Sequence, residues 1–234
     1  MLDLLANALH EFWIWLDGPY IRSISLFIAK GVGVTLQIYV VTLVFSIPLG
    51  VICAIGKISR VRILKIVLGA YTWLFRGTPL LLQLIFFYYG LTALTKGAVQ
   101  FDPLTAAFIA FSLNYAAYFT EIFRSGIQSI GKGQYEAAKA LGMNSRQTMR
   151  RIILPQAVKV VLPPMGNEAI TLIKDTALCS VITVTEILRN AQVTVARDVK
   201  VHGFFIAALM YLALTLIIIQ IFRLLERRFA YYKN

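Results

Sequence analysis

Charged and polar side chains lie inside stretches of this sequence that are otherwise apolar. Arg76 interrupts one such stretch and is followed by Gly77-Thr78-Pro79. A later stretch, at about 158–182, is the most polar and carries Asn167, Glu168, Thr171, Lys174 and Asp175. On a helix with about 100° per residue, these five side chains share a wedge of about a third of the circumference. Ionisable groups within apolar spans face protein or a water-filled path, so the wedge predicts a polar site.

The sequence lacks the patterns of common catalytic and metal sites. There is no GxxxxGK[ST] phosphate-binding loop. His10 and His202 lie far apart in the sequence, and neither belongs to a plausible catalytic triad or metal cluster. We therefore predict that the chain is not an enzyme, has no catalytic or metal-ligating residues and binds no cofactor of its own.

The composition indicates an integral membrane protein. The 234 residues are 59% apolar and only 15% charged, whereas soluble domains have about 45–50% apolar residues. The net charge of +12 could indicate nucleic acid, but the basic residues lie in loops between apolar stretches, so no nucleic-acid partner is expected. Cys53 and Cys179 lie in apolar runs and predict no disulfide framework.

The apolar stretches predict an all-α fold with five transmembrane helices, each covering the roughly 20 residues that a bilayer requires. The predicted spans are at about 31–55, 66–94, 104–122, 158–182 and 204–222. Residues 1–23 are expected to form an interfacial segment, residues 24–228 the transmembrane domain and residues 229–234 a tail. Residues 185–202 are expected to form a loop, and Gly31 and Gly33 allow close contact of the first span with another helix.

Basic residues are distributed unevenly among the loops. The 57–65 loop, the 124–151 loop and the tail carry about four, six and four Lys or Arg, against about five in all the opposite segments. Because cytoplasmic loops are enriched in Lys and Arg, this distribution predicts an external N-terminus and an internal C-terminus. The loop at 130–155, between the third and fourth spans, is then cytoplasmic.

Within that loop, helix-forming residues over 134–140 are followed by Gly142. Glycine reaches positive φ without a Cβ clash, so Gly142 is expected to end a short helix. A second short helix is expected over 145–151.

Asn144 or Ser145 would be the N-cap of this second helix. Pro155 is expected to stop it and to start the next span.

The same loop carries a long gapped motif with seven fixed positions: Glu136, Ala137, Ala138, Gly142, Ile152, Leu154 and Pro155. This pattern, EAA, three residues, G, nine residues and I-x-L-P, resembles the EAA loop of membrane subunits of binding-protein-dependent ABC importers. The stretches Arg76–Leu82, Gly166–Glu168 and Lys174–Leu178 resemble the polar amino-acid permeases within that family.

The resemblance implies a permease subunit in a bacterial cytoplasmic membrane, surrounded by lipid. Its implied partners are two cytoplasmic ABC ATPases, which hold ATP and Mg²⁺, a second permease subunit, identical or similar, and an external solute-binding protein. It also implies that the loop couples to the ATPase through Glu136, Ala137, Ala138, Gly142, Leu154 and Pro155.

Given an amino-acid substrate, two explanations of the polar groups stay open. Glu168 and Asn167 could hold an ammonium group or a cationic side chain, and Arg76 could hold a carboxylate. The candidate substrate-binding residues are Glu168, Asn167, Asn114, Tyr118, Thr171, Arg76 and Asp175. Alternatively, the buried charges pair with one another, which we favour for Arg76 and Lys174. The acidic wedge suits a cationic or zwitterionic amino acid.

Two other functions are considered. An ion-coupled secondary amino-acid transporter often has inverted repeats, which we do not detect in this sequence. A membrane scaffold or receptor component would not need the polar wedge in the fourth span.

Overall fold

The computed structural model describes residues 18–229, and over this range its regular secondary structure is helical. The α-helices are α2 (Pro19–Ile58), α3 (Arg62–Gly77), α4 (Leu80–Ile85), α5 (Leu91–Leu94), α6 (Pro103–Gln128), α7 (Lys132–Ala140), α8 (Ser145–Thr148), α9 (Leu154–Asp175), α10 (Ile187–Asp198) and α11 (His202–Phe229). Two π-helical turns, η1 (Phe86–Gly90) and η2 (Met149–Ile153), and a 3₁₀ segment, η3 (Thr176–Ile182), continue some of them.

Three described helices, α2, α6 and α11, are long and apolar enough to cross a membrane. The pair α3 and α4–α5 passes the same test together but is bent by 104° at its break, which gives up to four spans by length and composition. The predicted fourth span corresponds to α9 and η3, whose charges lower its apolar character. The count of five spans and the orientation of the termini remain predictions.

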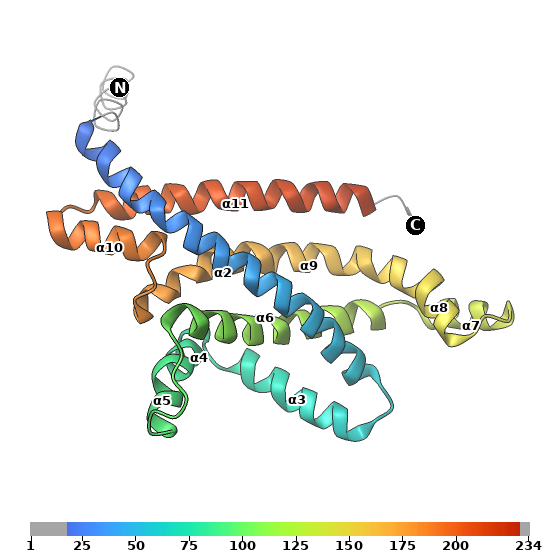
Figure 1. Ribbon diagram of the computed structural model, residues 1–234. Coiled ribbons are helices and arrows are strands. Elements are labelled where there is room, and N and C mark those ends of the chain that lie inside the picture. The colour runs from blue at the N-terminus through green and yellow to red at the C-terminus, as the bar shows by residue number, and fades with distance from the viewer. Residues whose placement is uncertain (1–17, 230–234) are drawn as a thin grey trace, which may run out of the picture.

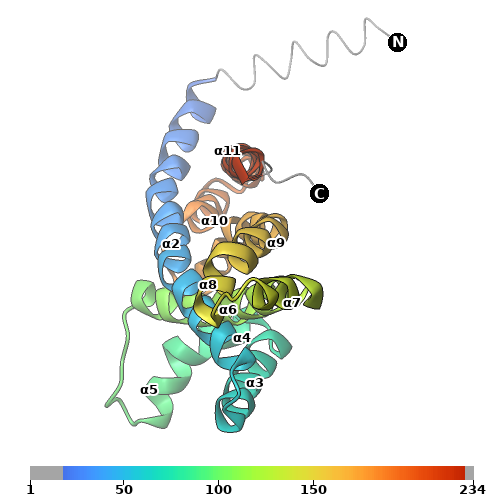
Figure 2. The same ribbon diagram turned by 90° about the vertical axis from the view of Figure 1, so that its right-hand side faces the viewer.

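The long helices form one bundle (Figures 1 and 2). The helices α6, α9 and α11 lie side by side, and α2 crosses them. The larger apolar core brings several helices together and includes Phe111, Tyr115 and Phe119 of α6 with Leu172 and Ile173 of α9. This packing fixes the relative positions of the polar faces of α6 and α9.

Glycines allow α2 to approach its neighbours closely. A Cβ added at Gly50 would lie 2.7 Å from the Cβ of Phe119 on α6. A Cβ at Gly31 would overlap the backbone of Glu186, so the close contact predicted at Gly31 is confirmed. Gly33 has no such neighbour within 4 Å, and the same prediction for Gly33 is wrong because it faces away from the bundle.

The helix ends differ from the predicted boundaries. The predicted interfacial segment falls on residues 1–17, which lie outside the described residues, and on the start of α2. The predicted loop at 185–202 instead contains α10. Its first turn is capped by the buried carboxylate of Glu186, which accepts hydrogen bonds from Leu188 N (2.7 Å) and Arg189 N (2.6 Å). The helix was not predicted because the polar residues on one face of α10 obscure, in the sequence, its buried face, which includes Ile187.

The second predicted span is broken at Thr78 and Pro79, where the backbone is extended. Proline has no N–H to donate and disfavours helical backbone at the residue before it, so the series of backbone hydrogen bonds of α3 ends here. The chain then turns sharply into α4, which leaves the residues at 76–79 beside α6.

The loop at 130–155 has the predicted pair of short helices. Gly142 follows α7 with φ +72°. Asn144 caps α8 through both hydrogen bonds of a capping box. Pro155 does not stop this helix, because the wider π turn η2 carries the helical backbone directly from α8 into α9.

Candidate functional site

A cavity of about 600 Å³ lies where the break between α3 and α4 faces α6 and α9. Its wall includes six of the seven candidate substrate-binding residues: Arg76, Asn114, Tyr118, Glu168, Thr171 and Asp175. Asn167 does not line it and is exposed, as is Lys174. The helical wedge therefore brings together Glu168, Thr171 and Asp175, but is narrower than predicted.

Arg76 enters the cavity from the end of α3 and lies over an aromatic ring of α6. Its guanidinium carbon is 5.3 Å from the centre of the Tyr118 ring, a cation–π distance. Within residues 18–229, no ion pair joins Arg76 or Lys174 to a carboxylate. The pairing favoured for these two residues is not formed as a direct ion pair in the described part of the chain and stays a prediction. The bend directs Arg76 to a ring, and Lys174 lies outside the cavity.

A hydrogen bond orients the carboxylate of Asp175. The hydroxyl of Tyr115 donates to Asp175 Oδ2 at 2.8 Å, and the tyrosine is 2% exposed. The sequence analysis missed Tyr115 as a site residue, because a tyrosine in an apolar run resembles an ordinary core residue. Its place one residue after Asn114, itself a candidate, is the signal that could have suggested it.

Asn114 lines the cavity, but its amide hydrogens are directed at protein acceptors. Nδ2 donates to the carbonyl of Phe75 (3.0 Å) and to Oε1 of Gln83 (2.9 Å). Thr171 likewise donates its hydroxyl to the carbonyl of Asn167 (3.0 Å) and keeps its oxygen lone pairs available. Both side chains therefore offer mainly acceptor atoms to a molecule in the cavity.

The charges of the cavity wall are unequal. The guanidinium of Arg76, at the break, faces the carboxylates of Glu168 and Asp175 on α9. When all three are ionised, the wall has a net charge of −1. A small molecule with one carboxylate and two positive groups has the complementary charges.

A second candidate site, the loop at 130–155, projects from one end of the bundle (Figure 1). Glu136, Ala137, Gly142 and Leu154 are exposed there, Pro155 is half-buried, and Ala138 is buried. The loop thus presents a compact, capped surface.

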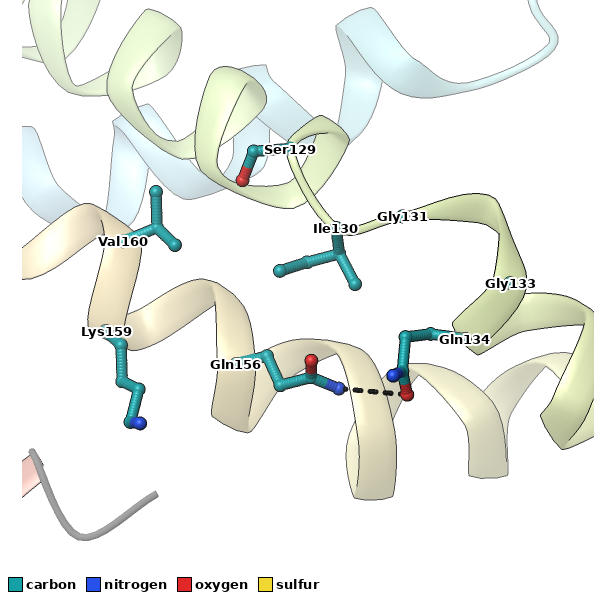
Figure 3. A pocket seen from close by; sticks show the side chains of 8 residues that line it. All are labelled: Ser129, Ile130, Gly131, Gly133, Gln134, Gln156, Lys159 and Val160. Carbon is teal, nitrogen blue, oxygen red and sulfur yellow. Dashed lines mark hydrogen bonds between the residues drawn. The ribbon is translucent and has the colours of Figure 1, made fainter. Parts of the chain in front are cut away.

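A hollow of about 690 Å³ lies at the base of this loop, between the end of α6, the start of α7 and α9. Figure 3 shows the side chains that line it. Gln134 and Gln156 point toward each other across it, and Gln156 Nε2 donates to Gln134 Oε1 at 3.4 Å. The hollow shares no lining residue with the cavity beside Arg76.

Charged residues tie α6 to its neighbours nearer this loop. Lys57 of α2 is paired with Glu121 of α6 and donates to Thr72 Oγ1 of α3 at 2.7 Å. Arg124 donates to the other carboxylate oxygen of Glu121 through Nε (2.9 Å) and NH2 (2.6 Å). One polar cluster therefore joins the C-terminal parts of α2 and α6 to the middle of α3.

The helical bundle with a broken span and a polar cavity defines an all-helical membrane permease. The model of the family described as "Binding-protein-dependent transport system inner membrane component" matches residues 46–231. The chain belongs to this family, and it is an integral membrane protein.

Named relatives are amino-acid permeases. The arginine transport system permease protein ArtQ of Bacillus subtilis is 42% identical over 203 residues, which cover 86% of this chain and 92% of that protein. A putative glutamine transport system permease protein, GlnP of Rickettsia felis, is 37% identical over 87% of this chain and 93% of its own length. The L-cystine transport system permease protein TcyB of Bacillus subtilis is 39% identical over 86% of each chain.

Solved structures show the same fold. The crystal structure of an amino acid ABC transporter with histidines includes a chain that is 33% identical, with a TM-score of 0.83 over 91% of this chain and 98% of that one. A chain of the MetNI methionine ABC transporter, at 17% identity, has a TM-score of 0.68 over 87% of this chain and 96% of its own. At that identity the likeness concerns the fold alone.

Proposed function

We propose that this chain is the permease subunit of an ATP-driven importer that moves a polar, cationic L-amino acid across the bacterial cytoplasmic membrane by alternating access. The observation that carries the proposal is the cavity in which Arg76 faces Glu168 and Asp175. The amino-acid permeases among the relatives support the substrate class.

The wall of the cavity suits the groups of such a substrate. The planar fork of Arg76 binds a carboxylate through two parallel hydrogen bonds. Glu168 and Asp175 then receive the α-ammonium group and the cationic side chain. Tyr118, Thr171 and Asn114 supply an aromatic face and acceptor oxygens, and Asn167 borders the site from outside the cavity wall.

In the proposed assembly, two cytoplasmic ATPases bind ATP and Mg²⁺ and hydrolyse ATP, while this chain holds no cofactor. A second permease subunit and an external solute-binding protein complete the importer. The family membership supports this arrangement.

The spans of this chain are assigned to α2, α3–α5, α6, α9 and α11, with the N-terminus outside and the C-terminus inside. This orientation places the loop at 130–155 in the cytoplasm, where the exposed residues of its EAA motif contact the ATPase. Glu136 and the basic side chains make polar contacts, Ala137 allows close approach, and Gly142 makes the corner between the short helices.

Uptake into proteoliposomes tests the proposal. The chain is purified with its co-expressed ATPase, ATP is enclosed, and the binding protein and radiolabelled amino acids are added outside. We expect ATP-dependent accumulation of arginine, lysine or histidine in preference to glutamate, and none with a non-hydrolysable ATP analogue. Accumulation that follows an ion gradient without ATP would overturn the proposal in favour of a secondary transporter.

A further inference from the structure

A buried glutamine, Gln83, lies beneath the break between α3 and α4, on the side away from the Arg76 cavity. Gln83 is 9% exposed and does not line that cavity. Its Nε2 group donates to Phe75 O (2.9 Å), to Thr78 Oγ1 (2.7 Å) and to Thr78 O (3.2 Å). One amide group therefore contacts the chain on both sides of Arg76 and Gly77.

These contacts satisfy carbonyls that the break would leave without partners. The last carbonyls of a helix have no N–H groups of their own helix to accept from. At the end of α3, the hydroxyl of Thr78 donates to Leu74 O at 2.8 Å, and the same hydroxyl oxygen accepts from Gln83. Without the glutamine, Phe75 O and Thr78 O would each lose a donor at a point where Pro79 supplies none.

Asn114 of α6 completes the arrangement. Its amide donates both to Phe75 O and to Gln83 Oε1, so the two side chains share one carbonyl and bond each other. Asn114 is 4% exposed. The bent segment is thus attached to α6, the helix that also supplies Tyr118 beneath the guanidinium of Arg76.

We infer that Gln83 and Asn114 are positioning residues that hold the bend so that Arg76 is directed into the cavity to bind the carboxylate of the substrate. This inference rests on the proposed function. It assigns a role to Gln83. It also means that Asn114 acts mainly by positioning Arg76, and less by contacting the substrate directly.

The test compares two ligands that differ by the carboxylate alone. L-arginine and agmatine, which is arginine without its carboxylate, are titrated into the purified permease–ATPase complex in the absence of binding protein. If Gln83 acts through Arg76, Gln83→Leu and the uncharged, similarly long Gln83→Met lower the preference for arginine over agmatine about tenfold, since small misplacements of a contact have effects of this size or larger. A general disturbance of the fold would weaken both ligands alike and leave the preference unchanged.

Matched variants complete the design. Gln37→Leu changes an exposed glutamine of α2 and is expected to keep the wild-type preference. Thr78→Val is expected to lower the preference, and Thr78→Ser, which keeps the hydroxyl, to restore it. In an Arg76→Ala background, Gln83→Met is expected to change the preference no further, because residues that act as a unit are non-additive.

The outcomes separate the two proposals. A wild-type complex that binds arginine, with an unchanged preference in both Gln83 variants, overturns the positioning role and leaves the proposed function standing. A further loss in the Arg76→Ala background also overturns it. A wild-type complex that neither binds nor transports any amino acid overturns the proposed function and the positioning role together.

Discussion

The hydroxyl of Tyr115 donates a 2.8 Å hydrogen bond to the carboxylate of Asp175, which joins α6 to α9 on the wall of the polar cavity. The tyrosine is buried in the core, so a rigid part of the bundle holds one of the two carboxylates of the proposed site. The carboxylate of Glu168, by contrast, forms no hydrogen bond or ion pair with another residue within the described part of the chain. The two carboxylates therefore differ in how firmly they are fixed.

We predict that Tyr115→Phe weakens arginine binding. The substitution removes the donor to Asp175 but keeps the ring in the core. Hydrogen bonds to charged groups contribute about 1.5–3 kcal/mol, so we expect binding weaker by about tenfold or more, measured by calorimetry on the purified complex. Tyr39→Phe is the control, since Tyr39 is also buried and its hydroxyl has no hydrogen-bond partner within residues 18–229. Equal binding by the two variants would contradict the role of Tyr115.

We predict that Glu168→Gln changes substrate selectivity. Removing one of two carboxylates leaves the cavity wall neutral when Arg76 and Asp175 are ionised. Uptake of arginine and lysine should fall at least tenfold, a loss of about 1.4 kcal/mol or more, and uptake of glutamine should fall less. The control is Glu226→Gln. Glu226 lies on α11 and does not line the cavity. Unchanged uptake of arginine, lysine, histidine and glutamine would show that the site is wrongly assigned.

We predict that Gly142→Asp abolishes uptake while membrane insertion stays normal. Gly142 has φ +72° at the corner between α7 and α8, and a side chain there strains the backbone and projects from the proposed ATPase contact. Gly133→Asp is the matched control, because Gly133 is exposed in the same loop without a positive φ and has nothing within 4 Å of an added Cβ. Uptake and membrane content are compared for the two variants. Normal uptake by Gly142→Asp would count against a coupling role.

We predict that Gly50→Ala destabilises the bundle. Its new Cβ would lie 2.7 Å from the Cβ of Phe119, so α2 must move away from α6. Overpacking of this kind costs about 1–3 kcal/mol, seen as a lower thermal unfolding midpoint in detergent. Gly33→Ala, where nothing lies within 4 Å of the added Cβ, should unfold at the wild-type midpoint or slightly above it, because alanine is about 0.5–1 kcal/mol more favourable than glycine inside a helix. Identical midpoints for the two variants would refute the close packing.

We predict an acid-dependent loss of stability that involves Asp198, which lies at the end of α10, outside the apolar spans. Hydrogen bonds from Arg197 and from the Tyr20 hydroxyl (2.8 Å) lower the pKa of Asp198 from its ordinary value of 3.8 to about 2. Because the folded-state pKa is depressed, the stabilisation is complete above pH 3.8 and is lost as the pH falls toward 2.

The Asp198→Asn variant should therefore be less stable than the wild type at neutral pH, and the difference should shrink across that acid range. Thermal unfolding of the detergent-solubilised chain measures both midpoints. A difference that stays constant from pH 7 to pH 2 would contradict the ionic contribution of Asp198.

Much of the cavity could be predicted from sequence, because helical periodicity and buried charge act locally. The spacing of Glu168, Thr171 and Asp175 placed them on one face, and Arg76 beside Thr78-Pro79 marked a break. Asn167 and Lys174 share the wedge but do not line the cavity, because a wedge of a third of the circumference is wider than the face of α9 that lines it.

The missed features depend on contacts between distant residues. Gln83 meets Asn114, 31 positions later, only after the chain has bent by 104°. A neutral residue such as Gln83 or Tyr115 in an apolar run does not reveal its partner. The helix α10 was not predicted because its buried face is short. Its N-cap, Glu186, is also a charged residue that would be expected in solvent from the sequence but is buried in the structure.

The helical backbone runs without a break from Ser145 through η2 to Asp175, so the projecting loop and the α9 wall of the cavity belong to one continuous element. Arg146 at one end and Glu168 near the other are separated by roughly 33 Å along the axis, at about 1.5 Å per residue. A flexible joint at Pro155 would absorb a force applied to the loop. Under the proposed coupling, the continuous backbone would pass such a force on, and a small tilt at the loop end would shift Glu168 and Asp175 relative to Arg76, which lies on a different helix.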